Sequence, residues 1–360
     1  TTLFRSTIWG LNTSWRKESQ WLTNQLDKLP FVNATRPSTI ALNAEVAQLI
    51  PGHSSVISAA GLAYIDDFES TQTTIDIHYP TFWYLASTPY NPNGGLFPEA
   101  TLSNNVEYGK NRALLAWYYV DPILNANSRN TPPNLRNNVE SQSNHLTRNV
   151  LEEEIFPNKE RLATQTSRLT ILNLSYYPTE RGPYNLDIDN INPDGTLMNP
   201  QQRWGGIMRK LDVTDFETAN IEYIEFWMMD PFIVDKDGTQ KGGDLYFNLG
   251  DISEDILKDG KKFFEQGLPL DADITKVDTT KWGKIPKTQS TVVAFDNSPG
   301  ARAKQDVGLD GLSTNEEQQF PTYKNYVEKI NQKIDVETRQ KWQSDSFSPL
   351  NDPAGDNYHF

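Results

Sequence analysis

Residues 203–253 contain three strand-like runs, RWGGIMRKL (203–211), NIEYIEFWMMDPFIV (220–234) and GGDLYFNLGDIS (242–253), with turn residues between them. The middle run is apolar on both alternations, which is typical of a strand covered on both faces. The third run alternates, with Leu245, Phe247 and Leu249 on one side. Together the three runs predict the centre of a β-sheet fold.

The rest of the chain extends this prediction to a mainly β fold. The chain has 360 residues, enough to bury a sizeable core, and its aromatic content of 11% with 21 Gly and 22 Pro is typical of short strands separated by turns. We predict a jelly-roll-like, galactose-binding-type β-sandwich. Its expected strands are 62–69, 73–79, 167–177, 203–211, 221–229, 243–249 and 289–296.

Three regions are expected along the chain. Residues 1–60 form an N-terminal strand or linker region, residues 61–300 the sandwich, and residues 301–360 an acidic loop, a helix and an irregular tail. Residues 91–166 are rich in Pro and Asn around one helical piece, so we expect an irregular, α-containing insertion that packs outside the sandwich. Helical spacing predicts a helical segment within 313–343, from the recurrence of Tyr323, Tyr326, Val327, Ile330 and Ile334.

The N-terminal region has a strand pattern of its own. Trp9, Leu11, Thr13 and Trp15 share one alternation. Aromatic residues near the ends of an alternating strand are typical of outer-membrane β-barrels, so one interpretation is a barrel-derived strand. The alternative is an ordinary surface strand, with a short helix from Ser19 to Leu29.

The charge and the missing cysteines exclude several classes of partner and site. The net charge of -14 argues against nucleic acid or an anionic membrane surface as the partner. It fits an extracytoplasmic surface that binds cations. The absence of cysteine excludes disulfides and thiolate metal sites. The longest apolar run, ALLAWYYV at 113–120, is too short for a membrane helix.

The segment DVGLDGLSTNEE has the spacing of a calcium loop. If Asp306 is its first position, Asp310 is the fifth, Leu312 the seventh and Glu317 the twelfth, which are carboxylate, backbone-carbonyl and bidentate-carboxylate positions. The third position is Gly308, which offers no side-chain oxygen. The sequence therefore predicts a Ca²⁺ site at Asp306, Asp310, Leu312 and Glu317, with a solvated acidic turn as the alternative.

A second carboxylate group is a weaker calcium candidate. Asp67 and Glu69 share one face of an expected strand and lie next to Asp66, and close carboxylates repel one another unless a cation or proton intervenes. Asp296 on the last expected strand is a third ligand by analogy with jelly-roll modules. The alternative is a polar outward face at the end of a strand.

Catalytic motifs do not stand out. The four histidines, His53, His78, His145 and His359, have unrelated contexts, and neither a nucleophile elbow nor a phosphate or dinucleotide loop follows an expected strand. Paired carboxylates for glycoside hydrolysis cannot be singled out in so acidic a chain. We therefore expect a protein that is not an enzyme.

Further distinctive sequence segments surround the three strand-like runs: YIDDFE (64–69), LASTP (85–89), EIFPNKE (154–160), YYPTERGPYN (176–185), ISEDILKDG (252–260), AFDN (294–297), QDVGLDGL (305–312) and NDPAGDNYHF (351–360). In this order they resemble the SprA (Sov) family of gliding-motility and secretion proteins, over nearly the whole chain. Members of that family are several times longer, so the resemblance implies an internal fragment.

The resemblance also implies a function. The family forms the outer-membrane translocon of the type 9 secretion system, a very large single-chain β-barrel with inserted globular domains. A structural role on the extracellular face is then expected, with the periplasmic face as the alternative. Secreted cargo and PorV-type accessory proteins would be its partners. A separate similarity of 61–90 and 168–300 to galactose-binding-type jelly rolls leaves a carbohydrate-binding module as the alternative function.

Overall fold

The structure is a computed structural model that describes residues 6–33, 36–51, 75–91, 95, 97–159, 167–219, 221–233, 242–261, 268–288 and 295–357. The chain divides into two compact units, Thr1–Thr73 and Thr74–Phe360. Helices account for 23% of the chain and strands for 19%. The architecture is therefore mixed, with small antiparallel sheets.

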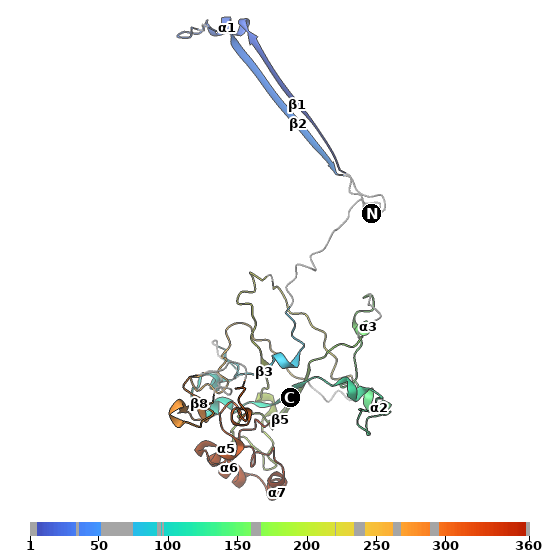
Figure 1. The fold of residues 1–360 in the computed structure, drawn as a ribbon, viewed down its shortest axis with the longest axis vertical. Helices are drawn as coiled ribbons and strands as arrows, with labels where there is room; N and C mark the ends of the chain where they lie inside the picture. Colours follow the sequence, from blue (N-terminus) through green and yellow to red (C-terminus); the bar gives the residue numbers. More distant parts are fainter. Residues whose placement is uncertain are drawn as a thin grey trace. The chain divides into compact units, whose positions relative to one another are not determined.

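The first unit is a long hairpin (Figure 1). β1 (Ser6–Ser19) pairs with β2 (Ser38–Pro51) in an antiparallel register that runs from Ser6 opposite Pro51 to Ser19 opposite Ser38. α1 (Gln20–Leu26) follows β1 directly, and its N-cap is Ser19, whose Oγ accepts a hydrogen bond from the Leu22 N–H at 3.3 Å. β1 fits both the barrel-derived and the surface interpretation of the strand, and the short helix expected within Ser19–Leu29 is present as α1.

The second unit contains three two-stranded antiparallel sheets among its described residues. β3 (Tyr84–Leu85) pairs with β6 (Ile207–Met208), and β7 (Val277–Thr279) pairs with β8 (Lys284–Pro286). The longest pair joins β4 (Ala113–Tyr118) to β5 (Asn173–Arg181), and its register shifts between Ala113 and Leu114. On β5 the residues skipped by this shift begin at Pro178, which has no backbone N–H to donate to the neighbouring strand.

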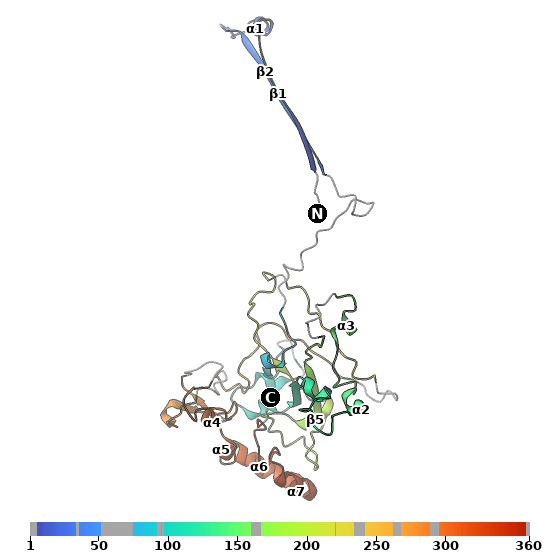
Figure 2. The same cartoon turned by 45° about the vertical axis from the view of Figure 1, so that its right-hand side comes forward.

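Helices dominate the C-terminal part of this unit. α6 (Pro321–Lys333) begins with a proline, whose missing N–H costs nothing in the first turn, and α7 (Val336–Ser344) begins at the Asp335 cap. Figure 2 shows α5, α6 and α7 following one another along one side of the unit. The shorter helices are α2 (Val139–Gln142), α3 (Glu152–Ile155), α4 (Arg302–Gln305) and α5 (Thr314–Glu317), and the 3₁₀ turns are η2 (Pro80–Phe82), η3 (Pro98–Thr101), η4 (Val106–Gly109), η5 (Pro122–Asn125), η6 (Pro200–Gln202) and η8 (Ile274–Lys276).

The helical prediction for the C-terminal segment is confirmed in detail. Tyr323, Tyr326, Ile330 and Ile334 are buried, so the stripe that the spacing predicted is the face that α6 turns inward. After α7 the chain continues as turns and loop to residue 357, as expected for the tail. Among the described residues, no helix has both the length and the apolar character needed to cross a membrane.

The core also contains residues of the segment 91–166, which was expected to pack outside. Tyr108, Ala113 and Trp117 are buried in the same cluster as Trp282 and α6. That part of the prediction is wrong, because the apolar run that forms β4 supplies side chains that the small sheets alone cannot provide. The short helices α2 and α3 do lie in this segment.

The sandwich prediction fails at its centre. Residues 221–229 and 243–249 are described but belong to no strand, and their side chains are mostly exposed. Of the run 203–211 only Ile207–Met208 is a strand, and residues 75–79 form none. The described part of the chain therefore shows paired strands but no two stacked sheets. The expected strand 62–69 and most of 289–296 lie outside the described residues.

Candidate metal centre

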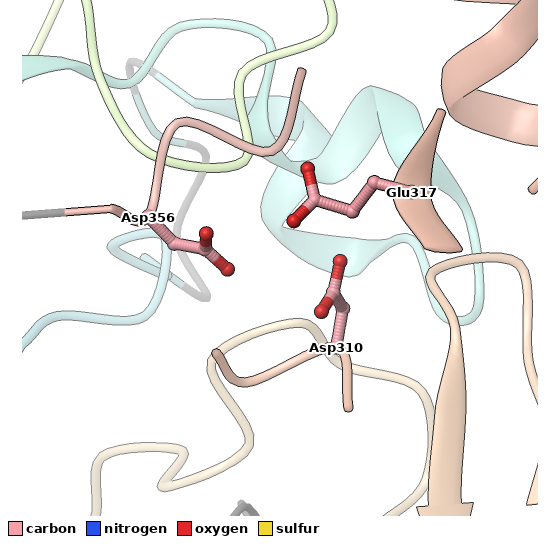
Figure 3. Close-up of side chains that lie close together, drawn as sticks. All are labelled: Asp310, Glu317 and Asp356. Carbon is pink, nitrogen blue, oxygen red and sulfur yellow. The ribbon is translucent and has the colours of Figure 1, made fainter. Parts of the chain in front are cut away.

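Three carboxylates of the second unit, two from neighbouring positions in the sequence and one from the tail, converge on one point (Figure 3). They belong to Asp310, Glu317 and Asp356, and each offers an oxygen that lies within 4.8 Å of the other two. Asp310 and Glu317 are buried, and Asp356 is partly exposed. The cluster joins a turn, a helix end and the C-terminal tail.

Asp310 is held in a turn between two glycines. Gly308 and Gly311 have φ angles of 85° and 66°, a region that favours glycine. The Leu312 N–H donates to Asp310 Oδ1 at 3.0 Å, and the Lys284 N–H of β8 donates to the Asp310 carbonyl at 2.7 Å. These bonds fix one carboxylate oxygen and leave the other, Oδ2, buried without a hydrogen-bond partner.

Glu317 reaches the cluster from the last position of α5. The helix begins at Ser313, whose N–H and Oγ–H both donate to Glu316 Oε2 at 3.0 Å. The Ala354 N–H donates to Glu317 Oε2 at 3.0 Å. Glu317 therefore touches the tail directly as well as facing Asp310.

Asp356 comes from the tail and fits beside a glycine. The Tyr184 hydroxyl donates to Asp356 Oδ2 at 2.7 Å, and the same hydroxyl oxygen accepts the Leu309 N–H at 2.6 Å. A Cβ on Gly308 would collide with the Asp356 carboxylate and the Tyr184 hydroxyl. The tail carboxylate thus occupies the space that a side chain at position 308 would need.

Backbone contacts hold the tail in this place. The Arg181 guanidinium donates to the carbonyls of Asp352 and Pro353, and it stacks 5.0 Å from the centre of the Tyr326 ring. Asp352 is buried, and its carboxylate accepts the N–H groups of Gly355 and Asn357 at 2.8 and 3.2 Å. Arg181 is therefore engaged by carbonyl oxygens rather than by the cluster.

Burial and mutual repulsion raise the pKa of all three carboxylates. Burial, followed by the charges of Asp356 and Glu317, raises the pKa of Asp310 well above its usual range. Burial and then the charge of Asp356 raise the pKa of Glu317 to about 8. Burial is also the main cause that raises the pKa of Asp356 to about 7, against the hydrogen bond from Tyr184, which lowers it.

Uncompensated negative charge is the chemical feature of this site. None of the salt bridges among the described residues involves Asp310, Glu317 or Asp356. The buried Tyr323 hydroxyl is the neutral donor beside Asp310, and its hydrogen bonding lowers the pKa of that carboxyl, although the contact lies outside the limits of a regular hydrogen bond. Such a group of carboxylates either keeps protons at neutral pH or holds a cation.

The predicted calcium loop is brought together only in part. Asp310 and Glu317 meet, whereas Asp306 pairs with Arg302, its Oδ2 lying 2.9 Å from Arg302 Nε. Leu312 buries its side chain in the core and orients Asp310 through its N–H. The loop therefore does not wrap around one point as an EF-hand loop does, because the chain turns away at α4 before Asp306.

The weaker calcium group has a different outcome. Asp67 and Glu69, with Asp66, lie outside the described residues. Asp296 is at the surface, where its Oδ1 accepts the Ser298 N–H at 2.7 Å, and hydrogen bonds from Ser298 lower the pKa of Asp296. This turn satisfies Asp296 locally and gives it no contact with the acidic cluster.

Sequence spacing alone did not single out Asp356. It stands 46 residues after Asp310, in a tail without periodicity. The available signals were the acidic, turn-rich run DPAGDN and the lack of a ligand at Gly308, which leaves room for one from elsewhere. No known family profile and no curated protein matches the sequence.

Proposed function

We propose that the chain is part of an outer-membrane protein-secretion translocon of the type 9 system. In this proposal β1 and β2 are neighbouring strands within the membrane, and the unit Thr74–Phe360 is a globular domain outside it. The family resemblance supports the proposal at the level of sequence. The observation that carries it in the structure is the division of the hairpin into one apolar and one polar face.

Directly opposed residues of antiparallel strands point to the same side, so the register defines the two faces. One face is mostly apolar, and it carries Trp9, Leu11, Trp15, Ile40, Leu42, Ala44, Val46 and Ile50. The other face carries the polar residues Asn12, Ser14, Arg16, Glu18, Thr39, Asn43 and Glu45, together with the apolar Ile8, Ala41, Ala47 and Leu49. Residues 7–18 and 39–50 are exposed on both faces, so no described residue of this unit covers the apolar face.

The hairpin is long enough for this role. Its strands have 14 residues each, which corresponds to about 48 Å at about 3.4 Å per residue. Strands that cross an outer membrane need about 9–11 residues at a tilt of about 45°. Their outward face is an apolar band about 25 Å tall, and the opposite side faces a polar interior. A hairpin with one lipid face and one aqueous face meets these requirements.

The globular unit would then contact cargo or accessory proteins. We place it on the extracellular side, with the periplasmic side as the alternative, and the net charge of -14 of the chain argues against nucleic acid or an anionic membrane surface as its partner. Cargo proteins and PorV-type accessory proteins are the partners that the family resemblance suggests. In this proposal the role is structural and does not include catalysis.

The test uses the absence of cysteine in the chain, which allows single labels to be placed. Val46→Cys and Glu45→Cys put an environment-sensitive dye on neighbouring positions that face opposite sides of the hairpin. In the full chain reconstituted into phosphatidylethanolamine and phosphatidylglycerol vesicles, the dye at position 46 should be quenched by brominated acyl chains and that at 45 by aqueous iodide. Equal quenching at the two positions would remove the support for a membrane hairpin.

A charge placed on each face tests the same point in the secretion machinery. Val46→Arg should prevent stable insertion, because an arginine on the lipid side near mid-membrane costs about 2–4 kcal/mol. Asn12→Arg is the matched control, since it lies at nearly the same depth on the polar face. Cells that depend on this translocon should lose cargo export with the first substitution and keep it with the second. Normal export with both would contradict the proposal.

Exposed aromatic side chains favour a second candidate, a carbohydrate-binding module. Tyr223, Trp227 and Tyr246 are exposed on the segments that were expected to form the galactose-binding-type sandwich, and exposed rings stack well on sugar faces. Binding of the full chain to a glycan array, lost in Trp227→Ala, would support this candidate. An array without signal would exclude it for the glycans displayed.

A further inference from the structure

We propose that Asp310, Glu317 and Asp356 bind a Ca²⁺ ion that fastens the C-terminal segment 352–357 to the turn at 308–312 and to α5. The three ligands all lie in the unit Thr74–Phe360, so this proposal does not depend on the membrane hairpin. It also differs from the loop predicted by sequence spacing. Asp356 takes part and Asp306 does not.

The strongest sign of a ligand is the orphaned oxygen of Asp310. Its side chain is 1% exposed, Oδ2 makes no regular hydrogen bond and has only the neutral Tyr323 hydroxyl beside it, and the carboxylate lies next to those of Glu317 and Asp356 (Figure 3). A buried carboxylate oxygen normally has a donor or a positive charge beside it. Arg181 is the one described cation that lowers the pKa of Glu317 and Asp356, and it makes no salt bridge with either, so a cation between the three carboxylates would supply the missing charge.

The second sign is that each remaining contact orients a carboxylate without neutralising it. Asp310 and Glu317 each accept one backbone N–H, from Leu312 and Ala354, and Asp356 accepts the Tyr184 hydroxyl. These donors are neutral, and they belong to the turn, to the tail and to the loop after β5. Each holds one oxygen of its carboxylate and leaves the other oxygen without a donor of regular geometry. Ligand orientation by outer contacts of this kind is usual in metal sites.

The donor set selects the kind of ion. All three ligands are carboxylates, the chain has no cysteine, and the four histidines are not among them. Oxygen donors suit the hard cations Ca²⁺ and Mg²⁺, whereas zinc prefers nitrogen and sulfur. Ca²⁺ accepts irregular geometry and gains from ligand charge, while Mg²⁺ demands a near-ideal octahedron. Three carboxylates from a turn, a helix end and a tail fit Ca²⁺ better.

Protons are the competitor for this site. The charged and titratable groups around it are Asp352 and Arg181 on the tail side, Tyr184 below the turn and Tyr323 on α6. Without a cation, the raised pKa values mean that the carboxylates keep protons near neutral pH. Calcium binding must therefore displace protons, so affinity should be measured at a fixed pH.

The experiment compares thermal unfolding of the full chain at pH 8 in excess Ca²⁺, in excess Mg²⁺ and in chelator. Asp310→Asn and Asp356→Asn remove one charge each while keeping the shape of the side chain. Asp306→Asn is the matched control, because Asp306 is in the same predicted loop but pairs with Arg302 outside the cluster. Because an ion that binds only the folded state raises the unfolding midpoint by mass action, the native chain and Asp306→Asn should both be stabilised by Ca²⁺.

The two cluster variants should lose that response, with calcium affinity reduced about tenfold or more, since affinity depends on the number of charged ligands. In chelator they should unfold at the same temperature as the native chain or higher, because the substitution removes repulsion. An equal calcium response in all four proteins would overturn the proposal, as would loss of the response in Asp306→Asn. An equal response to Mg²⁺ would overturn the choice of Ca²⁺.

Terbium luminescence gives a readout that needs no variant to fold. Tb³⁺ replaces Ca²⁺ in oxygen sites and emits when a nearby aromatic ring is excited, and Tyr184 and Tyr323 both adjoin the cluster. The native chain should show sensitised emission that Ca²⁺ displaces and Mg²⁺ at the same concentration does not. Absence of that emission from the folded native chain would overturn the proposal.

Discussion

Two apolar segments of the second unit differ in burial: one lies in the core and the other is exposed to solvent. α6 buries its apolar stripe, and Ile330 at its centre is 0% exposed. Residues 221–229 carry an even denser apolar run, yet Trp227 within it is 67% exposed. Both segments lie in the same compact unit. Apolar content alone therefore does not decide which of them enters the core.

The difference follows from where each segment finds its backbone hydrogen bonds. A helix makes its backbone hydrogen bonds within itself, so α6 needs no partner for its N–H and C=O groups, and its stripe packs in one cluster with Trp282, Tyr184 and Leu312. An extended segment needs a neighbouring strand for its N–H and C=O groups. The described chain places no such strand beside 221–229. A segment without that partner stays at the surface with its side chains.

The largest loss of stability is expected for a substitution in the buried core around α6. Trp282 is 0% exposed, and its ring meets that of Tyr184 edge to face at a centroid distance of 6.3 Å. Trp282→Ala should destabilise the chain by about 3–5 kcal/mol, since it removes a large aromatic and leaves a cavity. Urea unfolding followed by circular dichroism measures the change. A loss below about 1 kcal/mol would show that the core around α6 can collapse around the gap.

The next largest effect is a change of stability with pH, which we expect because the acidic cluster is buried in the same core region. Since the pKa of Glu317 is raised to about 8, the folded chain binds more protons than the unfolded chain between that value and the ordinary glutamate range. Stability in chelator should therefore fall as pH rises, by about 1.4 kcal/mol per pH unit well below that pKa and by about half as much at it, which amounts to about 2 kcal/mol from pH 6 to 8 for one such group.

Glu317→Gln should flatten this dependence, because glutamine does not titrate. Excess Ca²⁺ should flatten it in the native chain, since the ion takes the place of the protons. Urea unfolding at several pH values, with and without chelator, gives the slopes. Stability that rises with pH over this range, or an unchanged slope in Glu317→Gln, would contradict the assignment of the raised pKa to this carboxylate.

The same contrast explains how much of the fold was predictable. The helical stripe from Tyr323 to Ile334 was identified correctly because its periodicity reflects bonds within one segment. The strand within 167–177 was found in part, as β5. The strand predictions for 221–229, which is apolar on both alternations, and for 243–249, which alternates, use a local pattern that does not show whether a partner strand is available. Strand pairing depends on distant segments, which a local pattern does not specify.

The candidate site shows the same limit. Asp310 and Glu317 were identified because they are close in sequence and have a known spacing. Asp356 was missed because the tail reaches the turn only through tertiary contacts, among them Tyr184 and Ala354. Asp306 was included because the spacing rule assumes one continuous loop, and the pairing with Arg302 breaks that loop.

A smaller expected effect tests how tightly α6 is packed. Ile330→Val removes one methyl group from a side chain without solvent exposure. The expected loss is about 0.5–1.5 kcal/mol, from the transfer of that group and a small cavity. Val327→Ala on the same helix is a useful comparison, because Val327 is only partly buried. A larger loss per methyl group at position 327 than at 330 would mean that the inward face of α6 is not centred on Ile330.

The smallest loss of stability is expected for substitution of Trp227, in the exposed segment 221–229. Its ring contacts Phe156 edge to face, with centroids 6.2 Å apart, and is otherwise open to solvent. Trp227→Ala should change the stability of the isolated chain by less than about 0.5 kcal/mol, as surface substitutions usually do. This is far below the loss of about 3–5 kcal/mol that a buried tryptophan would give.

The comparison between Trp227→Ala and Trp282→Ala is therefore decisive, since the residue type and the substitution are the same and only burial differs. Urea unfolding of the two variants should separate them by several kcal/mol. If they unfold alike, residues 221–229 are covered in solution, and a strand or a second chain must supply their hydrogen bonds. If Trp227→Ala is neutral in isolation but weakens binding to a cargo or accessory protein, its exposed ring is a docking contact, because aromatic anchors dominate the energy of such interfaces.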